Sequence, residues 1–174
     1  MVTMDLPIDF VTRTKHLLGD SWNSFYTALN QESPISIRVN NSKVSDNIKP
    51  LPNVLWSDNG YYLKERPQFT FDPLFHAGCY YVQEASSMFI GQVIKQYTDN
   101  NIRVLDLCAA PGGKSTLITD IIDKNSLLVS NEVIRFRANI LSENIAKWGK
   151  ENVVVTNNEP SQIGQIEGFF DIIL

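Results

Sequence analysis

The chain has 174 residues, 43% of them hydrophobic, and a formal net charge of −4 at pH 7. This length suits one domain of ordinary size or two small ones, and the mild acidity without any basic run gives no compositional sign of nucleic-acid binding. The two cysteines lie far apart, which argues against a disulfide framework and a metal site, and we expect a cytoplasmic protein without signal peptide, lipid anchor or membrane span.

The first thirty residues are predicted to form a helical hairpin. Pro7 suits a first helical turn, and Gly19 can end the helix that follows it. The second helix carries aromatic residues at helical spacing, including Trp22, Phe25 and Tyr26. Such a stripe fits either an RNA-stacking platform or a packed core face, and its helical spacing favours the core face.

Residues 35–75 are predicted to form a small sheet. Apolar and polar residues alternate over 35–39, as in a half-buried strand. The apolar runs 54–56 and 61–63 flank Asn59-Gly60, which is a strong signal for a hairpin turn.

Together these elements predict a small α+β accessory domain over residues 1–78. Arg38 lies on the predicted polar face of its strand. It is our candidate for a contact with an RNA phosphate, and a solvated surface arginine is the alternative.

The next segment is predicted to contain a short strand at 80–82 and a helix that begins at Glu84. Polar residues at the start of this helix are explained by capping, or by a position lining a substrate cleft. The apolar residues expected to share one stripe of the helix are Ala85, Met88, Phe89, Val93 and Tyr97.

A strand, a tight turn and a helix are predicted around Leu105-Asp-Leu-Cys-Ala-Ala-Pro-Gly-Gly-Lys114. The strand is expected at 102–107, and apolar residues at helical spacing follow Lys114. Gly112 and Gly113 lack Cβ atoms, so a ligand can approach the backbone N–H groups at the helix N-terminus closely. This arrangement is typical of a nucleotide-like ligand site.

The spacing of the turn helps to select the ligand. A phosphate-binding P-loop needs a glycine five residues before its second glycine, and here that position is Cys108. A second strand, 127–131, ends in Glu132, about 20 residues after the glycines, where an acidic residue meets ribose hydroxyls in βαβ units. A ribose-binding acid without phosphate-binding apparatus favours S-adenosylmethionine.

Two more strands are predicted, at 152–156 and 169–174. Ligands of open α/β sheets bind outside the carboxyl ends of the strands. We therefore expect the glycine turn, Glu132 and residues 157–159 to meet in one crevice.

The run 105–114 closely resembles the cofactor motif of the Nol/Nop/Sun family of RNA (cytosine-5) methyltransferases, which includes bacterial ribosomal RNA enzymes. Arg38-Val-Asn40 resembles the family's upstream signature, and Tyr80–Met88 resembles the segment before its first strand. Phe170–Leu174 is similar to the strand that leads to its Asp-Ala-Pro-Cys motif. The resemblance implies a Rossmann-like methyltransferase sheet over 79–174, incomplete after its fourth strand, and RNA, above all ribosomal RNA, as the partner.

The resemblance also implies the roles of single residues. In the family an Asp after the third strand holds the adenine amine, and this sequence has Glu159 there, with Asn158 as the near alternative. The residues predicted to bind S-adenosylmethionine are Cys108, Ala109, Ala110, Pro111, Gly112, Gly113, Lys114, Glu132, Asn158 and Glu159.

The resemblance implies cytosine-5 chemistry through a cysteine thiolate that adds to carbon 6 of the base. The family's two cysteines lie in Asp-Ala-Pro-Cys and in a later Thr-Cys motif, so the nucleophile is expected beyond Leu174. Cys79 and Cys108 are expected to be inert thiols. We therefore expect no catalytic residue and no metal ligand within this sequence, and no methyl transfer by these residues alone.

Two alternatives remain open at this point. The chain could be a non-catalytic module that binds S-adenosylmethionine or RNA, or, less well supported, a P-loop-type nucleotide-binding protein. A fourth strand at 169–174 would leave an apolar sheet edge, which invites self-association.

Overall fold

The computed structural model describes residues 5–44, 51–98 and 101–174. Its contacts divide the chain into two compact units, Met1–Ser33 and Pro34–Leu174. The domain limit that we placed at residue 78 stays a prediction. Among the described residues, no helix is long and apolar enough to cross a membrane.

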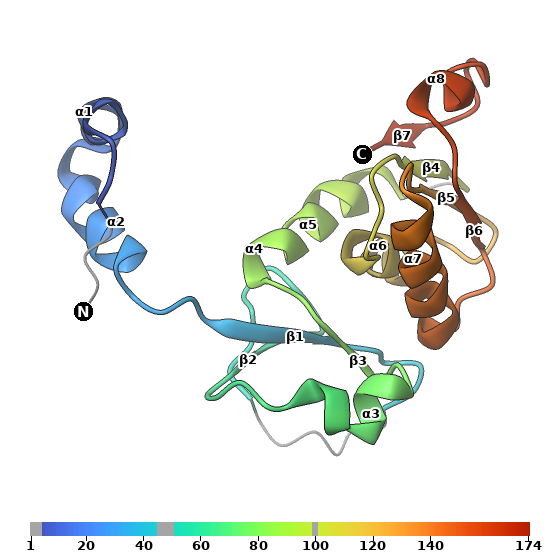
Figure 1. Ribbon diagram of the computed structural model, residues 1–174, viewed down its shortest axis with the longest axis horizontal. Helices are drawn as coiled ribbons and strands as arrows, with labels where there is room; N and C mark the ends of the chain where they lie inside the picture. Colours follow the sequence, from blue (N-terminus) through green and yellow to red (C-terminus); the bar gives the residue numbers. More distant parts are fainter. Residues whose placement is uncertain (1–4, 45–50, 99–100) are drawn as a thin grey trace. The chain divides into compact units, whose positions relative to one another are not determined.

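The first unit is the predicted helical hairpin (Figure 1). Helix α1 spans Ile8–Leu18, a 3-10 turn spans Gly19–Ser21, and α2 spans Trp22–Leu29. Gly19 ends α1 with a φ of 51°, as the sequence predicted for a glycine at this place. Trp22 is buried against Phe25 and Tyr26, whereas Tyr26 itself is 36% exposed. Only part of the predicted core face is therefore covered within this unit.

The second unit begins with a three-stranded antiparallel sheet in the order β2-β1-β3. Strand β1 spans Ile35–Val39, β2 spans Gly60–Leu63, and β3 spans Tyr80–Val82. The hairpin prediction is wrong for 54–56, which forms a turn beside β2 with one isolated bridge between Asn53 and Tyr61. Because β1 is the central strand, both of its edges are paired.

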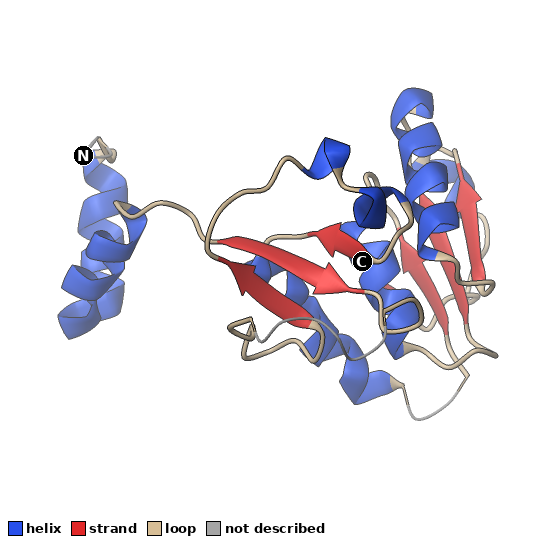
Figure 2. Cartoon of the chain, turned by 90° about the horizontal axis from the view of Figure 1, so that it is seen from below, coloured by secondary structure: helices blue, strands red, loops and turns tan. Residues whose placement is uncertain are grey.

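The second sheet is parallel, in the order β6-β5-β4-β7. Its strands are β4 (Arg103–Asp106), β5 (Leu127–Asn131), β6 (Val153–Thr156) and β7 (Ile172–Ile173). The parallel pairing confirms the Rossmann-like sheet that the resemblance implied, and the fourth strand lies beside the first. That strand is shorter than the predicted 169–174, and Ile173 is 63% exposed. Figure 2 shows the two sheets as separate groups of strands.

Helices cover both faces of the parallel sheet. Val104, Leu128 and Val153 are paired in register and so point to one face. That face packs against α5 (Ile90–Ile94), α6 (Gly113–Ile121) and α7 (Arg135–Trp148). On the other face, Leu105 and Val129 pack with Ile163 of α8 (Pro160–Ile163). These layers form a Rossmann-like parallel sheet, the fold class that the resemblance implied.

The helix predicted from Glu84 is interrupted. It forms α4 (Ala85–Met88), α5 and a 3-10 turn over Lys95–Tyr97. The predicted single stripe is wrong, because Val93 and Tyr97 are 40% and 60% exposed whereas Ala85 is buried. Met88 is fully buried, while Phe89 is 55% exposed. Two short elements, a 3-10 turn at Phe69–Phe71 and α3 (Pro73–His76), precede β3.

Candidate cofactor-binding site

The glycine turn follows β4 and leads directly into α6, as predicted. The N–H of Ala109 donates to the carbonyl of Asn131 (2.8 Å), and the N–H of Gly112 donates to the carbonyl of Ala109 (2.8 Å). Gly112 has a φ of 111°, and a Cβ there would lie 3.2 Å from a methyl of Leu141. The turn therefore requires glycine at 112 for its backbone conformation, and the missing Cβ also allows close packing against Leu141 of α7.

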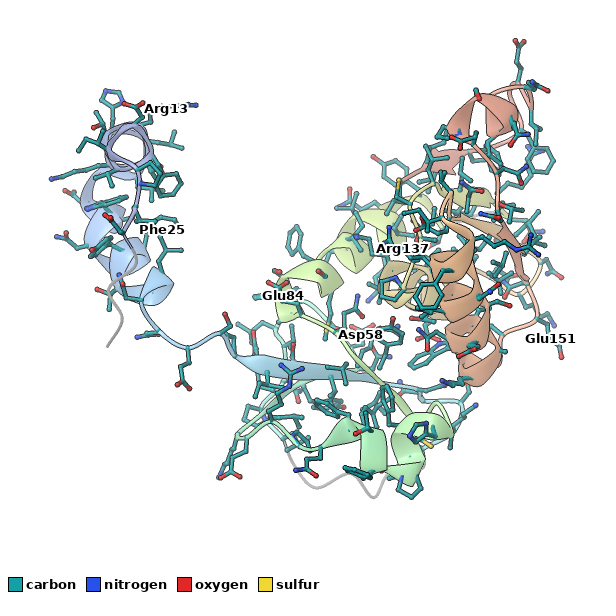
Figure 3. The ribbon with its side chains drawn as sticks, viewed as in Figure 1. Arg13, Phe25, Asp58, Glu84, Arg137 and Glu151 are labelled. Atoms are coloured by element: carbon teal, nitrogen blue, oxygen red, sulfur yellow. The ribbon has the colours of Figure 1, made fainter. Side chains whose placement is uncertain are left out.

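Helix α7 holds two outward carbonyl groups of this turn. The Arg137 guanidinium donates to the carbonyl of Ala110 (2.9 Å), and the Asn144 amide donates to that of Pro111 (2.8 Å). Arg137 is labelled in Figure 3 on α7. We did not predict either contact, although Arg137 and Asn144 are seven residues apart and so share one face of a helix.

Glu132 lies at the carboxyl end of β5, where the sequence placed it, and is 4% exposed. One carboxylate oxygen accepts the N–H of Ile134 (3.0 Å), and the other lies 3.3 Å from Arg137. Arg137 thus joins Glu132 to the glycine turn. Each carboxylate oxygen can accept a second hydrogen bond, so both can also bind a ligand hydroxyl.

Asn131 fixes the ends of three neighbouring strands, a role that sequence reasoning missed. Its side chain is fully buried. The amide nitrogen donates to the backbone carbonyls of Leu107 (3.3 Å) and Asn158 (2.9 Å). The amide oxygen accepts from the Thr156 hydroxyl (2.9 Å) and from the N–H of Asn158 (3.0 Å). The loops after β4 and β6 are therefore held to the end of β5, as a common crevice requires.

The two candidates for the adenine contact differ in their surroundings. Glu159 is exposed and is the N-cap residue of α8, and its N–H donates a hydrogen bond to the side-chain oxygen of Gln162 (2.9 Å). Asn158 is half-buried, and its amide nitrogen donates to the same Gln162 side chain (3.3 Å). The Asn158 amide oxygen consequently faces away from that bond.

Asp106 connects the end of β4 to the first turn of α6. The Ser115 hydroxyl donates to its carboxylate (2.7 Å), and both residues are buried. Burial raises the pKa of the Asp106 carboxyl, and the hydrogen bond from Ser115 opposes this rise. Lys114 and Cys108, also predicted here, are both exposed on the same loop and first helical turn.

Arg38 is placed differently from our prediction. It is fully buried, with its guanidinium bound to Asp120 (2.6 Å), Thr116 (2.5 Å) and Gln83 (2.9 Å) and stacked 4.4 Å from the ring of Trp148. The predicted polar, exposed face of the strand is wrong, because α6 and α7 cover it. The buried guanidinium has no surface from which to contact a phosphate.

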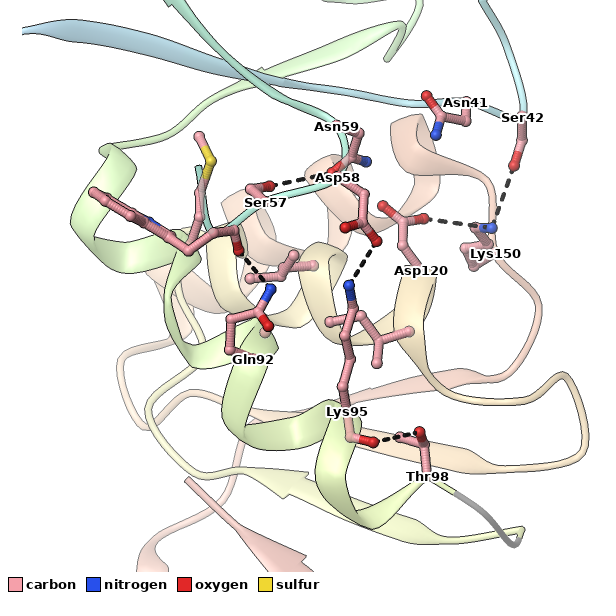
Figure 4. Close-up of a pocket in the computed structure, with 15 residues that line it drawn as sticks. Asn41, Ser42, Ser57, Asp58, Asn59, Gln92, Lys95, Thr98, Asp120 and Lys150 are labelled. Atoms are coloured by element: carbon pink, nitrogen blue, oxygen red, sulfur yellow. Dashed lines mark hydrogen bonds and ion pairs between the residues drawn. The ribbon is translucent and has the colours of Figure 1, made fainter. Parts of the chain in front are cut away.

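A cavity of about 280 Å³ lies elsewhere, between the turn at Ser57–Asn59 and helices α5 and α6. Figure 4 shows its charged side chains in pairs, Lys95 with Asp58 (2.5 Å) and Lys150 with Asp120 (3.4 Å). Because these charges neutralise one another, the described lining gives no reason to assign the cavity a charged ligand. Among the residues that the structure describes, no group of acidic, cysteine or histidine side chains could hold a metal ion.

Comparison with known proteins identifies the family of the chain. Residues 6–85 match the model of the N-terminal domain of 16S rRNA methyltransferase RsmF, and residues 93–174 match that of 16S rRNA methyltransferase RsmB/F. The chain belongs to the RsmB/F methyltransferase family. This membership agrees with the predicted resemblance, and it sets aside the P-loop alternative.

Curated members of the RsmB/F family are similar along almost the whole chain. Ribosomal RNA small subunit methyltransferase F of Pectobacterium atrosepticum is 29% identical over 97% of this chain. The protein of that name from Escherichia coli O139:H28 is 30% identical over 99% of it. The chain spans 38% and 39% of the lengths of these two relatives.

Solved structures support the same fold. A methyltransferase homolog protein from Pyrococcus horikoshii aligns with a TM-score of 0.81 and 26% identity, over 97% of this chain and 58% of that one. NSun6 from Pyrococcus horikoshii aligns with a TM-score of 0.75 and 16% identity, over 97% of this chain and 70% of that one. The second likeness concerns the fold alone.

Proposed function

We propose that the chain is the cofactor-binding part of an S-adenosylmethionine-dependent methyltransferase that modifies cytosine-5 of ribosomal RNA. The observation that carries this proposal is the junction of the β4–α6 turn with Glu132 at the carboxyl ends of adjacent parallel strands. The names of the RsmB/F relatives support ribosomal RNA as the substrate. The cytosine-5 position rests on the resemblance of 105–114 to the Nol/Nop/Sun motif.

The described residues fit S-adenosylmethionine. We assign the backbone of Cys108–Lys114 to the methionine moiety, because the turn presents N–H groups without a pyrophosphate-sized glycine loop. Glu132 is assigned to the ribose hydroxyls. Asn158 is assigned to the adenine amine, since its amide oxygen has no donor among the described residues and can accept from that group. Glu159, by contrast, faces solvent at the start of α8. The cofactor supplies the methyl group when bound.

The ribose assignment gives a first prediction. Glu132→Ala is expected to weaken binding of S-adenosylmethionine by about 1.5–3 kcal/mol, because two charge-assisted hydrogen bonds are lost. Isothermal titration calorimetry measures the difference. Glu132→Gln keeps the shape of the side chain and the acceptor for the N–H of Ile134, so its loss of binding free energy is expected to be smaller.

Glu143→Ala provides the matched control, because it removes an exposed carboxylate elsewhere on α7. Its affinity is expected to equal that of the wild type. If Glu132→Ala also binds as tightly as the wild type, Glu132 is not part of the site.

The chemistry of the reaction gives a second prediction. The 174-residue polypeptide is expected to bind S-adenosylmethionine but to transfer no labelled methyl group to 16S rRNA. Cys79 is buried, and Cys108 lies in the turn assigned to the cofactor, so neither thiol is placed to attack a cytosine. Filter binding of rRNA after incubation with methyl-labelled cofactor measures the transfer.

Cofactor binding in the same preparation is the control for correct folding. Labelled 5-methylcytosine produced by this polypeptide would contradict the expected role of a cysteine beyond Leu174. A longer reading frame in which Asp-Ala-Pro-Cys follows Leu174 would support it. A polypeptide that binds neither cofactor nor RNA would contradict the proposed function itself.

A further inference from the structure

The side chain of Gln83 has a buried nitrogen without a partner among the described residues. Gln83 follows β3 and is 6% exposed, and its Nε2 forms no hydrogen bond in the described part of the chain. A buried N–H donor that lacks a partner is destabilising, and most such groups in proteins have one. This nitrogen is therefore a candidate donor to a ligand or to a buried water.

The orientation of this amide is fixed by its neighbour. Gln83 Oε1 accepts from Nε of Arg38 at 2.9 Å. A guanidinium can only donate, so the oxygen of the amide, and not its nitrogen, must face Arg38. Arg38 is itself held by Asp120 and Thr116 of α6. The backbone of Gln83 is bound as well, since its N–H donates to Ser36 (3.2 Å) and its carbonyl accepts from the Ser36 hydroxyl (2.5 Å).

The amide nitrogen points toward the first residue of α6. A Cβ built on Gly113 would lie 3.6 Å from Gln83 Nε2 and 3.4 Å from the ring of Tyr81. Because Gly113 has no side chain, this space beside the helix N-terminus is not filled by the residue itself. The positive end of the nine-residue helix α6 and two amide N–H donors thus converge at one place.

We propose that Gln83 is a cofactor-binding residue whose Nε2 donates a hydrogen bond to the carboxylate of the methionine moiety of S-adenosylmethionine. The proposal rests on the function proposed above. Glu132 at the end of β5 takes the ribose, and Asn158 after β6 takes the adenine. The methionine moiety then extends in the opposite direction, over β4 and the start of α6, where Gln83 lies.

A carboxylate suits this place better than the amine of the same moiety. Both the amide nitrogen and a helix N-terminus favour an anionic acceptor. An ammonium group could not accept a hydrogen bond from Gln83 Nε2 or from the N–H groups of the helix N-terminus. Arg38 acts through Gln83, as a positioning residue that holds the amide with its N–H groups toward the ligand.

Two ligands that differ in the amino-acid moiety test the proposal. S-adenosylhomocysteine contains the carboxylate, whereas 5′-methylthioadenosine keeps the adenosine and the thioether but lacks it. Gln83→Glu keeps the acceptor for Arg38 and replaces the donor by an anionic oxygen. It is expected to lower the affinity for S-adenosylhomocysteine, measured by calorimetry, at least about tenfold. The affinity for 5′-methylthioadenosine is expected to change less than about twofold.

Two further variants complete the experiment. Gln83→Met removes the donor without adding charge, and it is expected to lower the affinity for S-adenosylhomocysteine about tenfold. Gln96→Glu adds the same charge at an exposed position and is expected to change neither affinity. Thermal unfolding without ligand establishes that each variant is folded.

The outcomes separate the two proposals. A wild-type protein that binds neither ligand overturns the proposed function. A wild-type protein that binds both, with Gln83 variants that bind S-adenosylhomocysteine equally well, overturns the role of Gln83 and leaves the function in place. Parallel loss of both ligands also overturns it, because the effect would then come from the fold or from a buried water rather than from the carboxylate.

Discussion

Replacing Arg38 by methionine is expected to lower the free energy of unfolding by about 3–5 kcal/mol. Arg38 is fully buried, and its guanidinium is the 2.6 Å partner of Asp120. Methionine has a similar length but cannot donate, so Asp120 and the Gln83 oxygen would lose their shared partner. Removing one member of a buried ion pair costs far more than the pair itself contributes, and here Asp120 would keep only the more distant Lys150, at 3.4 Å, as a cationic partner.

Burial lowers the pKa of the Arg38 guanidinium to about 10, and the neighbouring Asp120 carboxylate opposes this decrease. The guanidinium is therefore charged at neutral pH, where the substitution is to be measured by urea unfolding. Urea midpoints of the wild type and the variant give the difference when the slopes agree.

Lys95→Met is the matched control. It removes the ion pair between Lys95 and Asp58, which is as short at 2.5 Å but lies at the surface. An exposed pair contributes about 0–1 kcal/mol, so this variant is expected to be nearly as stable as the wild type. The double variant Arg38→Met with Asp120→Asn is expected to recover part of the loss, because it also removes the carboxylate that has lost its 2.6 Å partner. Equal, small effects of Arg38→Met and Lys95→Met would contradict the structural role of Arg38.

The local parts of the fold were predictable from sequence. A buried strand, a glycine turn and a helix at 102–122 depend on neighbouring residues, and all three lie where the pattern placed them. Parallel strands follow from successive βα units, and the order β6-β5-β4-β7 fits the Rossmann-like sheet that the resemblance implied. Glu132 could likewise be placed at a strand end by its spacing alone.

The contacts between distant segments could not be predicted in this way. Alternation over 35–39 indicates one exposed face, but α6 and α7, which follow much later in the sequence, cover it and bury Arg38. The same limit applies to Asn131, whose four hydrogen bonds join the ends of β4, β5 and β6. Period and propensity describe one segment at a time, whereas these side chains are defined by what packs against them.

Gly78 illustrates a second contact of this kind, between the turn before β3 and the end of α7. The carbonyl of Gly78 accepts from the Asn40 amide (3.1 Å), which also donates to the carbonyl of Trp148 (2.9 Å). Lys43 donates to the carbonyls of Ala77 (2.8 Å) and Lys147 (2.5 Å). The last carbonyls of α7 are thus capped by side chains that follow β1, while the turn itself lies directly against the helix.

Gly78→Ala is expected to lower the free energy of unfolding by about 2–5 kcal/mol, as the sum of a backbone and a packing effect. Gly78 has a φ of 70°, which disfavours any residue with a Cβ. In addition, that Cβ would lie 2.0 Å from the carbonyl oxygen of Lys147. A backbone oxygen cannot rotate away as a side chain can, so the turn and the end of α7 must separate and the hydrogen bonds of Asn40 and Lys43 must lengthen.

Gly168→Ala separates these two effects. Gly168 has a similar φ of 64°, but a Cβ there would meet no atom within 4 Å. It is expected to cost only the backbone part, about 1–2 kcal/mol. Thermal and urea unfolding of both variants give the difference, which measures how tightly the turn before β3 is packed against α7. Equal losses for Gly78→Ala and Gly168→Ala would show that the turn can move away from α7 without cost, and that the antiparallel sheet is not held to the parallel sheet at this point.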